Sequence, residues 1–188
     1  VSTAGLISTN GAVTVAAGSG FTGNGAIEAL GVVTIGTSGT LSGGRIVSMD
    51  GIALSGTIAN LSGDIESAKA VTVTASGLTL SGTLSAGTAL GITGTDVVST
   101  TTASLLAGTT LNVAASGDAT LAGSIGSLGN LTLGAGGALT LSGVAQSQNG
   151  SAMLSGQSVD ISGSLYTGGA STLSAVQGLT VSGLVSSV

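Results

Sequence analysis

The sequence of 188 residues predicts an all-β protein, a right-handed parallel β-helix with coils of about 20 residues. Three observations predict it. A short apolar–polar motif recurs along the whole chain at this spacing, Gly recurs at a fixed place within the motif, and the apolar residues are small aliphatic ones. A repeat of this length is typical of a solenoid, in which each coil contacts only its neighbours.

The recurring motif is clearest at Leu78–Leu84, where the alternation of Leu-Thr-Leu is interrupted by Ser-Gly and then resumes at once. The apolar residue that closes each copy recurs after 19 to 21 residues. Side chains at the same position of successive coils lie above one another in a solenoid. We therefore expect one buried column formed by Leu6, Ile27, Ile46, Ile65, Leu84, Leu105, Ile125, Val144, Leu165 and Leu184.

Each coil divides into three runs of alternating residues, which predicts three short strands per coil and roughly nine coils. The first run is a triplet such as Val33–Ile35 or Val71–Val73, and the third run ends at the column just described. Gly63 and Gly82 precede the third run by two residues, which predicts tight corners there. The second run is centred on Phe21, Leu41, Leu61, Leu80, Leu121, Leu141, Ile161 and Val181.

Other repeat architectures do not fit the sequence. The L-x-x-L-x-L-x-x-N motif of leucine-rich repeats and the G-G-x-G-x-D motif of calcium-binding coils are both absent. Left-handed hexapeptide coils require a multiple of six residues, which the observed spacing is not. The composition, 42% hydrophobic but 1% aromatic, predicts a narrow core of thin aliphatic layers.

The charge content excludes several classes of partner. A net charge of −5 with only 2 basic residues leaves no basic stripe for nucleic acid. No apolar run reaches the roughly 18 residues that a membrane-spanning helix requires, so we expect no membrane insertion. Because Cys and His are both absent, we expect no nucleophilic triad, no metal site and no cofactor.

Both basic residues have an acidic residue one coil away. Arg45 precedes Asp64 by 19 residues, and Asp50 precedes Lys69 by 19 residues. Stacked strands lie about 4.8 Å apart, so these spacings predict two ion pairs, Arg45–Asp64 and Asp50–Lys69, on neighbouring coils. Such exposed pairs test the alignment of the coils and add little stability.

Two carboxylates suggest an alternative function. Glu28 and Glu66 share a column two coils apart, about 9.6 Å, which resembles the separation in an inverting glycosidase. The favoured interpretation is two solvated carboxylates on an exposed face. For Asp96, Asp118 and Asp160 we expect corner or strand-surface roles rather than catalysis.

Two further patterns lead to no assignment. Thr14, Thr34, Thr72 and Thr132 share a column that resembles an ice-binding ladder, but other residue types interrupt it, and Thr is a common outward residue of strands. Three triplets of the N-glycosylation type begin at Asn60, Asn130 and Asn149. Such triplets arise readily by chance in a chain rich in Ser and Thr.

The repeating units, such as Gly129–Gly143, resemble the haemagglutinin repeats of filamentous-haemagglutinin-type exoproteins. That family comprises large bacterial adhesins and contact-dependent inhibition proteins that are secreted by the two-partner route. The resemblance implies a right-handed β-helical stalk, exported through an outer-membrane partner and located outside the cell or on its surface. The Pro-containing motifs of the family's secretion domain are missing, since the chain has no Pro.

Together these observations predict a structural and adhesive rod rather than an enzyme. Neither end carries a recognisable cap, so we expect residues 1–188 to be one β-helix segment of a longer rod. The expected partners are neighbouring coils of a longer parent chain, like rods, a host or bacterial surface receptor or glycan, and the secretion partner. The alternatives are a carbohydrate-active β-helix enzyme and a self-assembling filament or surface-layer subunit.

Overall fold

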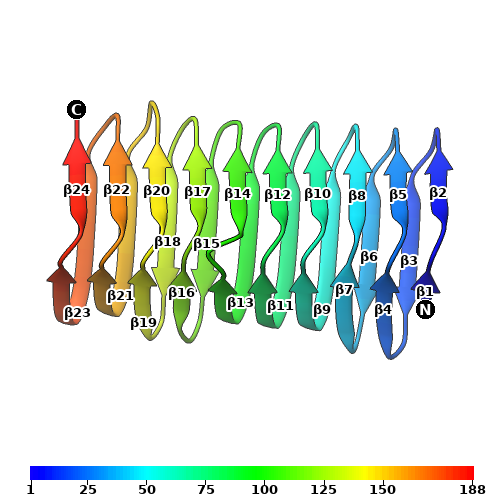
Figure 1. Ribbon diagram of the computed structural model, residues 1–188, viewed down its shortest axis with the longest axis horizontal. Helices are drawn as coiled ribbons and strands as arrows, with labels where there is room; N and C mark the ends of the chain where they lie inside the picture. Colours follow the sequence, from blue (N-terminus) through cyan, green and yellow to red (C-terminus); the bar gives the residue numbers. More distant parts are fainter.

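Parallel strands stacked coil upon coil form the whole of the computed structural model, which describes residues 1–188 and contains no helix. The chain rises through one sheet, turns over the top and descends through a second sheet, while it advances from the N-terminus to the C-terminus (Figure 1). This path is right-handed, as expected for parallel strands joined by crossovers. The predicted all-β solenoid of about nine turns is confirmed.

The first sheet contains ten short strands, one from each coil. They are β2 (Leu6–Thr9), β5 (Ala26–Ala29), β8 (Arg45–Ser48), β10 (Asp64–Ser67), β12 (Thr83–Ala86), β14 (Ser104–Ala107), β17 (Ser124–Ser127), β20 (Val144–Ser147), β22 (Ser164–Thr167) and β24 (Leu184–Ser187). Each strand corresponds to a predicted third run. Together they form the face that is nearer in Figure 1.

The second sheet contains fourteen strands, of which nine are short and five are long. The short strands are β1 (Ser2–Thr3), β3 (Val13–Ala17), β4 (Gly20–Gly23), β6 (Val33–Thr37), β7 (Thr40–Gly43), β15 (Leu111–Ala115), β16 (Ala119–Leu121), β18 (Leu131–Ala135) and β19 (Ala138–Leu141). The long strands are β9 (Ile52–Leu61), β11 (Val71–Leu80), β13 (Leu90–Ser99), β21 (Ala152–Ile161) and β23 (Ser171–Val181).

The prediction of three short strands in every coil is therefore wrong for the coils with long strands, where the first and second runs join. The number of residues at the intervening corner explains the difference. Inward residues flanking the corner are five residues apart in β9, from Leu54 to Ala59, and six apart between β6 and β7, from Ile35 to Leu41. The additional residue bends the chain and ends the strand. In β23 the additional residue is accommodated as a bulge opposite Gly156–Ser158.

The core consists of columns of inward side chains. Strand pairing places Ile27, Ile46, Ile65, Leu84, Leu105, Ile125 and Leu165 in one column of the ten-stranded sheet, completed by Ile7, Ala145 and Val185. Because parallel pairing repeats at every coil, aliphatic side chains stack without large aromatic residues. Phe21, near the N-terminal end, is the one Phe and is buried.

Three residues of the predicted column face outward instead. Leu6, Val144 and Leu184 are 64%, 46% and 49% exposed. Each is followed by a second apolar residue, and that second residue takes the inward position. A shift of one residue reverses the face of a strand, so the prediction at these three positions is wrong.

The predicted second-run column is out of register by two residues between Leu41 and Leu61. Leu41 pairs with Ala59, whereas Leu61 pairs with Gly43. Both positions face inward, because a shift of two residues preserves the face of a strand. Alternation in the sequence therefore does not distinguish these two inward columns.

Glycines at the corner before the ten-stranded sheet allow the coils to approach closely. A Cβ atom on Gly63 would overlap the backbone of Gly44 in the preceding coil, and one on Gly82 would overlap that of Gly63. Gly123, with a φ of 80°, lies over Ala103 of the preceding coil. Ala103 directly follows a tight turn at Thr101 and Thr102. At Gly63 and Gly82 the spacing of the coils leaves no room for a side chain.

We expect Gly63→Ala to lower the melting temperature, because the methyl group would push two coils apart. Gly77→Ala is the matched control, since Gly77 lies in β11 without a positive φ, and a methyl group there would have no atom within 4 Å. That control should be neutral or stabilise by about 0.4–1 kcal/mol. Thermal unfolding followed by circular dichroism tests the order, and equal melting temperatures would contradict the assigned corner.

We expect Ile65→Asp to destabilise the chain by about 3 kcal/mol or more, because it buries an unpaired charge in a fully buried column. Thr72→Asp, on the outward side of β11, should change the stability little. Urea unfolding of the two variants provides the comparison. The opposite order would contradict the assignment of inward and outward faces.

Candidate functional site

The outer face of the ten-stranded sheet carries side chains of several chemical types. Strand pairing aligns the third residue of each strand in one outward column: Ser8, Glu28, Val47, Glu66, Ser85, Leu106, Gly126, Gln146, Tyr166 and Ser186. Acidic residues occur in its N-terminal half. The half from Ser85 onward has no charged residue.

Arg45 forms its ion pair with Glu28 of the preceding coil, through Nη1 and Oε1, and not with Asp64. The predicted Arg45–Asp64 pair is therefore wrong. Acidic residues flank Arg45 on both sides, and the side chain reaches the diagonal neighbour across the strands. Both partners are almost half exposed, so the pair contributes at most about 1 kcal/mol.

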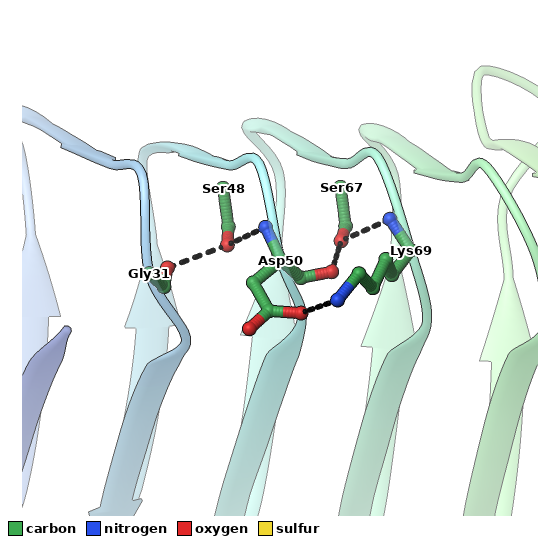
Figure 2. A network of polar contacts seen from close by, with 5 residues as sticks. All are labelled: Gly31, Ser48, Asp50, Ser67 and Lys69. Atoms are coloured by element: carbon green, nitrogen blue, oxygen red, sulfur yellow. Dashed lines mark hydrogen bonds and ion pairs between the residues drawn. The ribbon is translucent and has the colours of Figure 1, made fainter. Parts of the chain in front are cut away.

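The structure places the second predicted pair together. Lys69 Nζ lies 2.5 Å from Asp50 Oδ1, at the corner after the ten-stranded sheet. Next to this ion pair, two serine hydroxyls connect successive coils (Figure 2). Ser48 Oγ donates to the Gly31 carbonyl at 2.8 Å, and Ser67 Oγ donates to the Asp50 carbonyl at 3.1 Å.

Each of these hydroxyls also accepts a hydrogen bond. The Asp50 amide donates to Ser48 Oγ, and the Lys69 amide donates to Ser67 Oγ, both at 3.1 Å. One buried hydroxyl thus satisfies a corner amide of its own coil and a carbonyl of the preceding coil. The same inward column contains Ser127, Ser147 and Thr167, and Ala at positions 29, 86 and 107.

Sequence reasoning missed this hydroxyl column, although a pattern for it exists. Ser or Thr stands two residues after the inward aliphatic residue in most coils, as at Ser48 and Ser147. Ser147 Oγ donates to the Gly129 carbonyl of the preceding coil at 2.6 Å. In a chain so rich in Ser, the sequence does not distinguish this position from the outward serines.

Asp96 and Asp118 have the expected corner role and lie one coil apart. Asp96 Oδ1 accepts a hydrogen bond from the Asp118 amide at 3.0 Å, and Asp118 Oδ1 accepts one from the Ala138 amide at 2.8 Å. Gly117 and Gly137 leave room for these carboxylates, because a Cβ atom at either position would collide with them. Both carboxylates therefore satisfy backbone amides of the next coil.

Glu28 and Glu66 do not form a paired acidic site. They lie on opposite sides of Val47 in the same outward column, two coils apart as expected. Arg45 binds Glu28, and the recess beside this ion pair, of about 290 Å³, is lined by Glu28 but not by Glu66. The two carboxylates thus face no common cavity.

The uncharged half of the column borders two recesses of about 370 and 460 Å³. Gln146 and Gln148 line both, so the two shallow recesses adjoin at these side chains, and together they are called the groove. Leu106 and Leu128 border its first part, and Tyr166 its second. Sequence reasoning did not identify this groove, because its residues are of several chemical types and come from successive coils of the chain.

Comparisons of the chain with protein-family models, with curated proteins and with solved structures found no match. The resemblance to haemagglutinin repeats thus remains a prediction. None of the acidic side chains gather in a group of three that could hold a metal ion. No helix suited to crossing a bilayer occurs in the chain.

We expect Ser67→Ala to destabilise the chain by about 1–3 kcal/mol, because it leaves the Asp50 carbonyl and the Lys69 amide without their shared partner. Asp50→Asn, which removes only the exposed ion pair, should cost at most about 1 kcal/mol. Urea unfolding measures both. A larger effect of Asp50→Asn would show that the ion pair, and not the hydroxyl, holds this corner.

Proposed function

We propose that the chain is a stretch of an extracellular structural rod that serves as an adhesive stalk on a bacterial surface. One observation carries this proposal: the inward column of the ten-stranded sheet continues in register from β2 to β24. Such a fold extends along one axis and not around a central cavity. A rod of this shape would hold the part of the protein at its far end away from the cell surface.

The way in which the coils associate supports export before folding. Each strand pairs with the strand one coil away, and the chain has no Cys, so no disulfide must form. A chain of this kind can fold progressively as it emerges, with each coil providing the edge on which the next one pairs. This is consistent with the two-partner secretion that the resemblance to filamentous-haemagglutinin-type proteins implies.

The composition of the exposed surface supports a rod that contacts other molecules along its length. Ser, Thr and Gly form much of the exterior, and only 5% of the residues are charged. Weak charge repulsion permits close approach to like rods or to a neutral receptor. We infer that adhesion involves the outer face of the ten-stranded sheet, where the exposed side chains are of several chemical types.

A carbohydrate-active enzyme is less well supported. Arg45 engages Glu28, and Glu66 lies outside the recess that Glu28 lines, so the two carboxylates could not act on one glycosidic bond from a shared cleft. A rod requires neither carboxylate to titrate or to contact a substrate.

We expect antibodies raised against the chain to label intact source cells, and external protease treatment to remove the label. Deletion of these residues from the gene in the source cell should reduce attachment of the cells to their target surface. Flow cytometry and an attachment assay measure the two effects. A label that appears only after the cells are permeabilised would overturn the extracellular assignment.

The matched control for attachment is a chain carrying Thr72→Asp, which we expect to fold and to be displayed normally. Glu28→Gln and Glu66→Gln separate the rod from the enzyme. Polysaccharide breakdown by the purified chain that both substitutions abolish would contradict the rod, whereas unchanged attachment in both variants supports it.

A further inference from the structure

The shallow groove on the outer face of the ten-stranded sheet has one position in its floor, Gly126, without a side chain. Gly126 stands in the outward column between Leu106 of β14 and Gln146 of β20. Gly108 lies at the adjoining corner. A Cβ atom on Gly126 would lie 3.2 Å from Leu106 Cδ2, so Leu106 borders this position, whereas Gly108 packs against the backbone of Gly87. Leu106 and Leu128, which flank the groove, are 42% and 48% exposed.

The polar side chains along this groove have unused hydrogen-bonding capacity. The amides of Gln146 and Gln148 and the hydroxyl of Tyr166 make no hydrogen bond within the chain, although the chain's other polar side chains include many that bind corner backbone groups. Tyr166 is 39% exposed and pairs with Gln146 across the strands. The groove thus offers an aromatic ring beside two amides, each able to donate and accept.

From this arrangement we infer that the groove binds an uncharged, linear oligosaccharide that lies along the rod axis. A sugar ring presents apolar C–H groups on its face and hydroxyls at its rim. Tyr166 and Leu106 suit the former, and Gln146 and Gln148 suit the latter. This inference rests on the proposed function, since it names the ligand class of an adhesive rod.

The spacing of the coils favours a ligand that runs along the axis. Successive strands lie about 4.8 Å apart, close to the length that one pyranose ring adds to an extended chain. Leu106, Gly126, Gln146 and Tyr166 occupy successive coils, so successive sugar rings would each meet one of them. The two recesses fall within the volume range typical of ligand sites.

The lining residues argue against other ligand classes. No charged side chain lines either recess, so an acidic or basic polymer would find no side chain of opposite charge there. An extended peptide would gain most of its affinity by pairing with a free strand edge. Here the backbone of β14, β17, β20 and β22 is already paired on both sides within the sheet, and the groove lies on its face.

Tyr166 makes the inference directly testable, because the chain has 1 Tyr and no Trp. Titration with neutral cello-oligosaccharides and malto-oligosaccharides of increasing length should change the emission of this one ring in a saturable manner. Calorimetry on the same solutions should give the same Kd, and the longer oligosaccharides should bind more tightly. Polygalacturonate and an uncharged extended peptide serve as comparators and should not saturate.

Three variants identify the groove as the site. Gln146→Ala should raise the Kd about 10-fold, and Gly126→Val, which fills the floor, should abolish binding. Gln157→Ala, on the exposed side of β21 in the other sheet, is the matched control and should leave the Kd unchanged. Circular dichroism melts establish that each variant is folded.

The inference is overturned if neither neutral series gives a saturable change by emission or calorimetry, if polygalacturonate or the peptide binds more tightly than the neutral sugars, or if Gly126→Val binds as well as the unaltered chain. These results are distinguishable from failure of the rod proposal. Surface labelling of intact cells does not depend on sugar binding, and the titration does not depend on where the chain is located.

Discussion

Parallel backbone pairing between successive coils is the interaction on which the rest of this structure depends. Once one coil is placed, each strand of the next coil is fixed in register by hydrogen bonds to it. The stacked aliphatic columns, the serine hydroxyls bonded to the amides of Asp50 and Lys69, and the close glycine corners all follow from that register. Each of these features repeats contacts of the same kind between successive coils, so they form together with the strand pairing and not independently of it.

The sequence predicts the architecture well because the register of the strands requires apolar residues to recur at a regular spacing. The predicted inward positions of Ile65 and Leu84 are correct, since each of these residues is flanked on both sides by polar or charged residues. The prediction fails at Val144 because Ala145 beside it is also apolar, and the smaller residue is the buried one. Spacing alone does not decide between two adjacent apolar residues.

The outer face is harder to predict, for a different physical reason. Inward positions must fit the same space in every coil, whereas outward positions meet only solvent and their immediate neighbours. Arg45 has two acidic neighbours within reach, and the choice between them depends on side-chain geometry rather than on spacing. Gly126, Gln146 and Tyr166 form a groove only because they follow one another in a column, which composition does not reveal.

The strands run across the long axis of the molecule (Figure 1), and this has a mechanical consequence. A pull on one chain end along that axis would break the rows of backbone hydrogen bonds one after another, since each coil is attached only to its two neighbours. The molecule would lengthen under tension by releasing single coils from the loaded end, while the remaining coils stay intact. A molecule of this kind would yield gradually and absorb a sudden load without losing its whole length.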